Sequence, residues 1–269
     1  AYVAAAEDTA EELLDIRFKE GSTSSQRLAN LIHNASVESR NKSTYPYQVM
    51  TMLCTSTESA FLPLLTTATL KTDVTIPKET GGGNGNGAGE EQSEDGEKTI
   101  ILDGGVVFKG GKELCKVDDD GAMAIFFMND TPSEYSFTVP LEHNAMPSVT
   151  LIGVTRSIKA TEYNGRVKFD VTFSASGKIG TKGGIKEDDK KAAEKVAEPA
   201  ERELKRKIES SVIPIAKKGC DVFGLENTLR RCCNRFYTEN KDRVGELIAE
   251  SEIEVNVNID IFSQGIGGA

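Results

Sequence analysis

The chain has 269 residues, a formal net charge of −10, 38% hydrophobic residues and 28% charged residues. These proportions are ordinary for a globular protein of two or three modest domains. The acidic balance argues against a nucleic-acid-binding protein, which usually presents a basic face. No run of 18 apolar residues is present, so we expect no transmembrane helix within this sequence.

The first segment, residues 1–78, is predicted to be mainly helical and to end in a strand. Its start, "AYVAAAEDTAEELLD", is typical of a strand that runs into a helix capped by Asp8 or Thr9. Ser24 or Ser25 could cap a second helix, and "ESAFLPLLTTATLK" indicates a connection into a strand. Because the sequence begins like the inside of a domain, we expect any export or lipid-attachment signal to lie upstream of it.

Residues 79–98 form a segment rich in glycine and acidic residues, "ETGGGNGNGAGEEQSEDGEK". Such a composition buries too little apolar surface to offset its ordering entropy, which predicts a mobile linker or loop. It contains no true G-x-G-x-x-G, and no long apolar strand directly precedes it, so a phosphate-binding loop is not indicated.

Residues 99–131 are predicted to form a small middle domain. The pairs Gly104-Gly105 and Gly110-Gly111 interrupt apolar runs and favour tight turns between short strands. The following "DDDGAMAIFFMND" predicts a short helix capped by an Asp. Its acidic cluster does not fit an EF-hand calcium loop, since Lys116 and Phe127 would then occupy ligand positions.

The C-terminal segment, residues 132–269, shows the clearest periodicity. Three stretches alternate apolar and polar residues, and Asn164-Gly165 between two of them is a strong hairpin signal. Residues 188–216 and 225–249 carry apolar stripes at helical spacing, with Pro199 and Pro214 expected to kink or bound the first helix. The last strand, "SEIEVNVNIDIF", has one apolar and one polar face. The stripe of the first helix consists of Ala193, Val196, Ala200, Leu204, Ile208, Val212 and Ile215.

Together these elements predict an α+β, multi-domain chain in which antiparallel sheets pack against amphipathic helices. The predicted organisation is the remainder of an N-terminal α/β domain (1–78), a linker (79–98), a small middle domain (99–131) and a C-terminal domain of antiparallel sheet plus helices (132–269).

No catalytic constellation is indicated. The two histidines, His33 and His143, lie far apart in unrelated elements, and no G-x-S-x-G nucleophile elbow accompanies them. The acidic pairs fall in loops or at helix starts, where they act as caps and solvated turns. We therefore predict no catalytic residues and no cofactor.

The five cysteines do not indicate a metal or redox site. Cys232 and Cys233 are adjacent, so on a helix their side chains diverge by about 100°. Cys220 lies twelve residues away from them, and no C-x-x-C occurs. Cys232 falls on the predicted apolar stripe, where a free cysteine behaves as a small hydrophobe.

The motif Asp221-Val222-Phe223-Gly224 lies between a helix that ends in "IPIAKKG" and a second amphipathic helix, which is followed by the alternating last strand and Gly265. This order resembles the C-terminal half of the Ger(x)C family, the lipoprotein C subunits of bacterial spore germinant receptors. "GGVVFKGGKELCKVDDDGAMAIFFMND" is similar to the middle segment of the same family. "VAAAEDTAEELLD" and "ESAFLPLL" resemble parts of its N-terminal domain, so the resemblance spans most of the chain in the order of the family.

The Asp-x-Phe-Gly motif is expected to be a structural corner of the fold. Gly224 can adopt a positive φ, and Asp221 can accept backbone N–H bonds and cap the helix that follows. Phe223 would anchor the turn in the core.

The resemblance implies a non-enzymatic receptor subunit that supports assembly or signal transfer. It implies integral membrane A and B subunits as partners and a lipid-modified N-terminal cysteine, missing from this sequence, as a tether. The location implied is the outer face of the spore inner membrane. We suggest the polar face of the last strand, Glu254, Asn256, Asn258 and Asp260, as a partner surface. The alternative is an extracytoplasmic small-ligand-binding protein, which would need a concave site with convergent polar groups.

Overall fold

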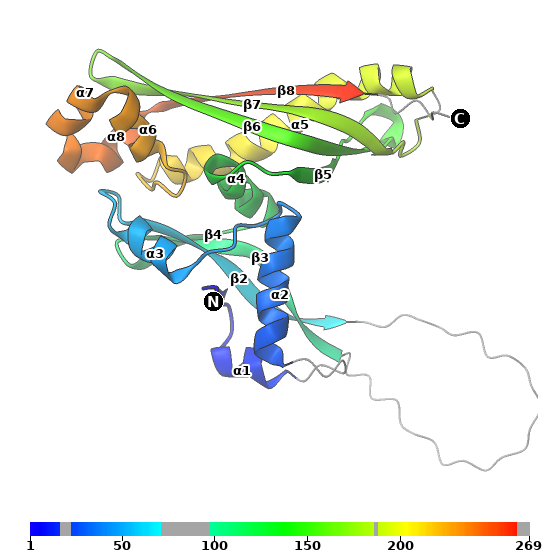
Figure 1. The fold of residues 1–269 in the computed structure, drawn as a ribbon, viewed down its shortest axis with the longest axis horizontal. Coiled ribbons are helices and arrows are strands. Elements are labelled where there is room, and N and C mark those ends of the chain that lie inside the picture. The colour runs from blue at the N-terminus through cyan, green and yellow to red at the C-terminus, as the bar shows by residue number, and fades with distance from the viewer. Residues whose placement is uncertain (17–22, 71–96, 186–187, 263–269) are drawn as a thin grey trace, which may run out of the picture.

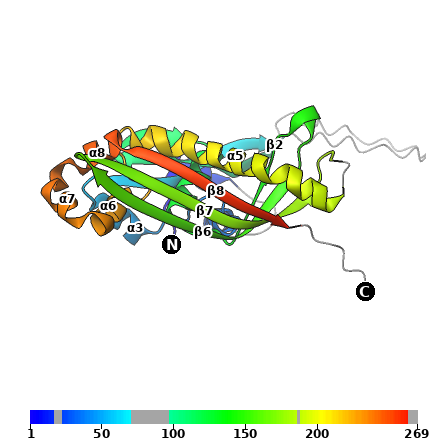
Figure 2. The same ribbon diagram turned by 90° about the horizontal axis from the view of Figure 1, so that it is seen from above.

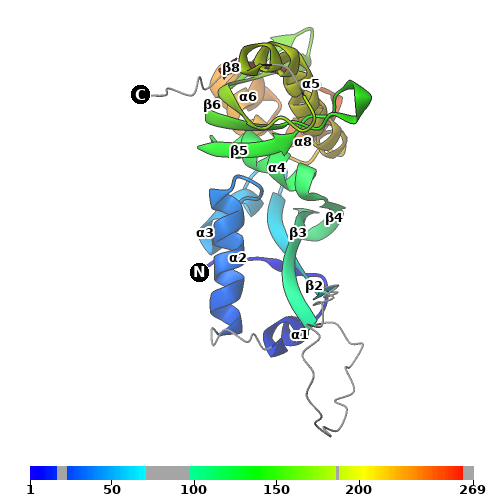
Figure 3. The same ribbon diagram turned by 90° about the vertical axis from the view of Figure 1, so that its right-hand side faces the viewer.

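The computed structural model describes residues 1–16, 23–70, 97–185 and 188–262. These residues form two four-stranded sheets and the helices that pack on them (Figure 1). The predicted α+β class is confirmed. Seen from the side, the two sheets are stacked with one helix, α4, between them (Figure 3).

The first sheet has the strand order β1-β2-β3-β4 and is accompanied by three helices. Thr9 caps the first helix, as predicted, and its side chain is part of a capping box with Glu12. Thr23, rather than Ser24 or Ser25, caps the second helix, because its hydroxyl accepts a bond from the Gln26 N–H. The elements are β1 (Ala5–Ala6), α1 (Ala10–Asp15), α2 (Ser24–Val37), α3 (Pro46–Leu53), β2 (Ser59–Leu70), β3 (Glu97–Lys109) and β4 (Lys112–Val117).

The two glycine pairs of this sheet have different roles. Gly110-Gly111 forms the turn between β3 and β4, as predicted, with both residues at positive φ. The prediction of a turn at Gly104-Gly105 was wrong, because this pair lies inside β3. A Cβ on Gly105 would lie 2.2 Å from Cε2 of Phe61, so a glycine is needed here for close packing rather than for a change of direction.

Strands on both sides of the predicted linker belong to one sheet. β2 pairs antiparallel with β3 from Ser59↔Lys109 to Leu70↔Glu97. Most of the predicted linker 79–98 lies outside the described residues, and its last two positions begin β3. The segment 99–131, predicted as a separate small domain, supplies β3 and β4 to the first sheet and then α4.

The helix α4 (Asp119–Asn129) is the centre of the molecule. Asp118 caps it, as the sequence predicts, by accepting a bond from the Gly121 N–H. Every residue from 121 to 128 is buried. A helix that is apolar all round must be covered on all sides, and α4 shares one core with residues of both sheets, such as Phe61 and Phe173.

The second sheet has the strand order β5-β6-β7-β8. Its strands are β5 (Glu134–Thr138), β6 (Ser148–Tyr163), β7 (Arg166–Thr181) and β8 (Glu252–Phe262), with a short 3-10 turn, η1 (Glu142–Asn144), after β5. The turn between β6 and β7 is formed by Asn164 (φ 52°) and Gly165 (φ 77°). Both positive φ angles are those of the hairpin turn that the Asn-Gly pair predicts.

The prediction that the sheets are antiparallel needs a correction. β8 pairs parallel with β7, from Lys168↔Glu252 to Lys178↔Phe262, and β1 pairs parallel with β2. Both sheets are therefore mixed. The parallel pairing of β7 with β8 follows from the long helical connection between them, since parallel neighbours need a crossover that carries the chain back to the start of the first strand.

The helix α5 (Asp189–Ala216) begins this connection and runs lengthwise along β8 (Figure 2). Asp188 caps it, and all seven residues of its predicted apolar stripe are buried. Pro199 and Pro214 lie inside the helix and do not end it.

The second predicted helix, residues 225–249, is divided into shorter pieces. These are α6 (Leu225–Cys232), α7 (Asn234–Glu239), η2 (Lys241–Arg243) and α8 (Val244–Glu250). The chain leaves the helical conformation at Cys233, with φ −130° and ψ 52°. This break shifts the periodicity, so Cys233 packs against the core, whereas Cys232, predicted on the apolar stripe, is exposed.

Candidate functional site

The Asp-x-Phe-Gly motif forms a corner between the end of α5 and the start of α6, and we refer to residues 221–224 as the corner. Gly224 has φ 77° and occupies the N-cap position of α6. A Cβ at this position would meet no atom within 4 Å. The glycine is therefore required for its backbone conformation and not for space.

Asp221 caps α6 in place of the missing Gly224 side chain. Its Oδ1 accepts bonds from the N–H groups of Phe223 (3.2 Å) and Leu225 (2.9 Å), and its Oδ2 accepts one from Glu226 (2.7 Å). A carboxylate is favourable at this end of a helix because the free N–H groups carry partial positive charge. Burial raises the pKa of Asp221, and the three backbone N–H bonds oppose that shift.

The corner is bonded to both halves of the molecule. The N–H of Asp221 donates to Oγ of Ser59 in β2 (3.0 Å). The side-chain amide of Asn129, at the end of α4, donates to the carbonyl of Val222 (2.7 Å). Phe223 is 1% exposed and belongs to the main core. The corner therefore connects the first sheet, the central helix and the second sheet.

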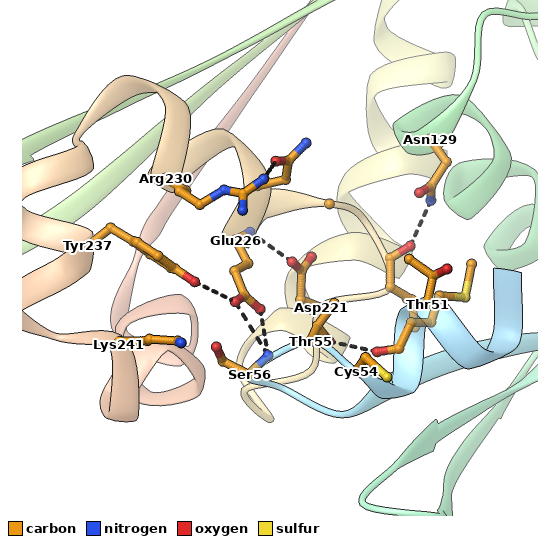
Figure 4. Close-up of a pocket in the computed structure, with 14 residues that line it drawn as sticks. Thr51, Cys54, Thr55, Ser56, Asn129, Asp221, Glu226, Arg230, Tyr237 and Lys241 are labelled. Carbon is orange, nitrogen blue, oxygen red and sulfur yellow. Dashed lines mark hydrogen bonds between the residues drawn. The ribbon is translucent and has the colours of Figure 1, made fainter.

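Glu226 makes a second link across the same junction (Figure 4). Its two carboxylate oxygens accept bonds from the N–H of Ser56 (3.3 and 3.1 Å), which lies between α3 and β2. The hydroxyl of Tyr237 in α7 donates to Oε1 (3.0 Å). The role of this buried glutamate could not be predicted, because on the sequence it is one more acidic residue in the first turn of a helix.

A cavity of about 630 Å³ lies beside the corner, between the end of α3 with the loop after it and the helices α6 and α7 (Figure 4). The loop after α3 contributes Cys54 to its lining, and the helical side contributes Arg230, Tyr237 and Lys241. Its volume falls in the range of small-ligand pockets. We call it the junction pocket.

The lining of the junction pocket does not form an acid–base pair. The oxygens of Asp221 and Glu226 accept bonds from protein donors, and no histidine is among the lining residues. His33 lies within 3.3 Å of the Tyr2 hydroxyl, and His143 belongs to η1. A general base needs a free position within reach of its substrate, whereas these two carboxylates are already bonded to protein donors.

The cysteines are free thiols in the structure. Burial raises the pKa of Cys220, whose thiol is fully covered, and also that of Cys233. Within the part of the chain that the structure describes, no group of three histidine, cysteine or acidic residues could hold a metal ion.

The four polar residues of the last strand share the face of the second sheet opposite the core. Val255 and Ile259, on the other face of β8, are buried. Glu254 pairs with Lys168 of β7 (2.6 Å), and this hydrogen bond lowers the pKa of Glu254. None of the four residues, Glu254, Asn256, Asn258 and Asp260, lines the junction pocket, so the predicted corner and the predicted partner surface are separate.

No helix among the described residues is both long and apolar enough to cross a membrane.

Comparison with known proteins places the chain in a family. No curated protein sequence matches it. The crystal structure of the GerBC protein has a similar fold, with a TM-score of 0.61 at 13% identity, over 97% of this chain and 68% of that chain. The family model described as spore germination B3/GerAC-like, C-terminal, matches residues 103–265. This match covers more than half of the chain and confirms the resemblance to Ger(x)C proteins. The chain belongs to the spore germination B3/GerAC-like family.

Proposed function

We propose that this chain is the C subunit of a nutrient germinant receptor and that it supports receptor assembly or signal transfer in spore germination. The family match over residues 103–265 carries the proposal, and the GerBC-like fold over 97% of the chain is consistent with it. The junction pocket, whose carboxylates are occupied by protein donors, favours a role without chemistry of its own.

The proposed partners are the integral membrane A and B subunits of the receptor. In this proposal a lipid-modified cysteine upstream of the sequence tethers the subunit to the outer face of the spore inner membrane. The resemblance to the Ger(x)C family is the support for both statements.

We propose the polar face of the second sheet as the surface that meets a partner. Strand pairing continues the face of β8 across β7 and β6, and its centre consists of uncharged hydrogen-bonding side chains. Interface centres are depleted in charged residues relative to the rest of a protein surface. An uncharged central patch on a chain that is 28% charged is therefore consistent with an interface. The central rows are Ser157–Thr172–Asn256 and Thr155–Ser174–Asn258, and the proposed contact set on β8 is Glu254, Asn256, Asn258 and Asp260.

We also propose that Asp221, Phe223 and Gly224 act as a structural corner. Their bonds to β2, α6 and the core support a role in holding the two sheets in one arrangement.

The test is a germination assay in the spore-forming source organism. The gene is deleted and complemented with the full-length protein, and the loss of optical density of purified spores is followed under single nutrients. We expect germination to fail for one nutrient class and to be restored by the wild-type gene. Normal germination in the deletion strain, and in a strain that also lacks the other receptors, would overturn the proposal.

The same strain tests the partner surface. Asn258→Arg places a bulky charge on the polar face, and Glu198→Arg places one on the exposed side of α5 as a matched control. We expect only Asn258→Arg to reduce complementation at equal protein level. Equal complementation by both variants would remove the polar face from consideration.

A second candidate function is small-ligand binding, and the junction pocket is the observation that favours it. Titration calorimetry of the chain against amino acids and sugars would give saturable heat if it is correct. Absence of heat with every compound, together with a germination defect, would leave the receptor-subunit role alone.

A further inference from the structure

A second pocket, of about 360 Å³, lies on the other side of the corner. Its lining comes from the end of α4, the middle of β6, the last two residues of the corner, and α6 as far as its last turn. The polar side chains of its lining include Asn129 from α4, Arg156 from β6, and Asn227, Thr228 and Arg231 from α6. We call it the arginine pocket.

Positive charge is concentrated at the arginine pocket. Arg156 and Arg231 line it and repel each other, and the half-buried Lys42 interacts with Arg156 from the first half of the chain. Asp130 is the acidic group that opposes them. Two arginines that line the pocket, with Lys42 near Arg156 but outside the lining, face one acid, which leaves a local surplus of positive charge in a chain whose net charge is −10.

Most side-chain N–H groups of these three cations make no hydrogen bond to the described residues. Arg156 donates through Nη1 to the carbonyls of Phe127 (3.3 Å) and Asp130 (3.5 Å), which fixes the guanidinium while its remaining N–H groups have no partner there. Within the described ranges, the side chains of Arg231 and Lys42 make no hydrogen bond or ion pair. Among the described residues no buried side-chain nitrogen lacks a hydrogen-bond partner, so these free donors are open to solvent, where an oxyanion can reach them and form charge-assisted hydrogen bonds.

Burial also lowers the pKa of Arg156 and of Lys42. Desolvation disfavours the charged form, and a nearby like charge adds to this effect. An arginine remains protonated even so. The cations of this pocket are therefore held in a state that an anionic ligand would stabilise.

We propose that the arginine pocket binds a small oxyanion, a carboxylate or a phosphate group, held between the guanidinium groups of Arg156 and Arg231. Planar guanidinium groups suit the paired oxygens of both anions, and the pocket volume suits a small ligand. The two groups come from β6 and α6, so the ligand would link the second sheet to the helix that follows the corner.

A bound anion would also stabilise the contacts at the junction between the two halves of the molecule. The arginine pocket and the junction pocket share Asn129, Gly224 and Asn227. Asn129 donates to the carbonyl of Val222, and the corner is bonded to β2 through Ser59. Because a ligand stabilises the state that binds it, the anion would stabilise this arrangement of α4, β6 and α6. The inference does not depend on the receptor role.

The test uses the purified chain and two probes, inorganic phosphate and acetate, at constant ionic strength. Titration calorimetry and thermal unfolding are measured for each probe. We expect saturable heat and a rise in Tm for at least one, and the probe that binds more tightly identifies the phosphate or the carboxylate class. No saturable heat and no rise in Tm with either probe would overturn the proposal.

Variants separate a defined site from diffuse attraction. Arg231→Gln removes one exposed cation of the pocket and should weaken binding about tenfold or more, a typical loss for a charge-assisted bidentate contact. The matched control is Arg235→Gln, since Arg235 is 93% exposed, pairs with Glu239 and lies outside the pocket. An equal loss in both variants would overturn the proposal.

Arg156→Lys adds a test of geometry, since it keeps the charge and removes the planar fork. We expect weaker binding together with a Tm close to that of the wild type in the absence of anion. Unchanged affinity in this variant and in Arg231→Gln would show that the heat arises elsewhere on the chain.

Discussion

The two sheets of this molecule differ in the lengths of their strands and covering helices and in the size of their cores. The second sheet has β6 and β7 of 16 residues each and is covered by α5 of 28 residues. The first sheet is accompanied by helices of 6, 14 and 8 residues, and among the described residues its own separate core contains four buried side chains, Leu13, Ile32, Leu65 and Ile100. Other buried residues of this sheet, such as Phe61 and Val107, belong to the main core, where they share a cluster with α4.

The first sheet therefore depends on the second half of the molecule for much of its stability. A small core provides little hydrophobic free energy to offset the conformational entropy of folding. Packing against α4 and the links through Asp221 and Glu226 connect the first sheet to the larger core. The predictions below test this dependence.

The largest effect is expected from truncation of a leucine in the main core. Leu204 of α5 is 1% exposed, and Leu204→Ala should lower the free energy of unfolding by about 4 kcal/mol. Leu13 of α1 is 3% exposed in the small core, and Leu13→Ala should cost about 2 kcal/mol because that site can relax more easily. Urea unfolding followed by circular dichroism measures both. Equal costs would contradict the difference between the two cores.

The next effect is expected at the junction. Glu226→Ala should lower the free energy of unfolding by about 2 kcal/mol, because it leaves the Ser56 N–H and the Tyr237 hydroxyl without their acceptor. Tyr237→Phe is the milder control and should cost about 1 kcal/mol. Urea unfolding measures both free-energy changes. In hydrogen exchange of Glu226→Ala, we expect the amides of the first sheet to lose protection before those of the second. A change below about 0.5 kcal/mol for Glu226→Ala, the usual limit for surface substitutions, would show that the junction does not couple the sheets.

A smaller effect is expected at the corner. Gly224→Ala forces a Cβ into a left-handed conformation and should cost about 1 kcal/mol, although the space around it is open. Gly224→Asn should cost less, since Asn tolerates this conformation. Thermal unfolding of the two variants gives the order. An alanine variant as stable as the wild type would mean that the corner can change its backbone conformation freely.

The smallest effect is expected at the polar face of β8. Lys168 lowers the pKa of the half-exposed Glu254, so the pair adds stability above the unfolded pKa of a glutamate, about 4.3, and loses it as the pH falls through the lower folded pKa. Glu254→Gln should therefore lower Tm slightly at neutral pH and make no difference in acid. A Tm difference that persists below pH 3, or one that grows there, would contradict this sign.

Local patterns in the sequence determined much of the second half. The helical stripe of α5, the Asn164-Gly165 turn, the Asp118 cap of α4 and the alternation of β8 depend on neighbours within a few residues. The order of these elements was also enough to indicate the family that the match over residues 103–265 shows. Periodicity and helix capping depend on residues close together in the sequence, so they could be predicted without a structure.

The contacts between distant segments depend on tertiary packing and could not be predicted from the sequence. The parallel pairing of β8 depends on where the helical crossover returns, and the place of Gly105 inside β3 depends on the Phe61 ring that packs on it. Glu226 becomes a bridge only because Ser56, 170 positions away along the chain, lies beside it. The arginine pocket likewise joins β6 to α6. Such contacts are set by long-range packing, which local periodicity does not encode.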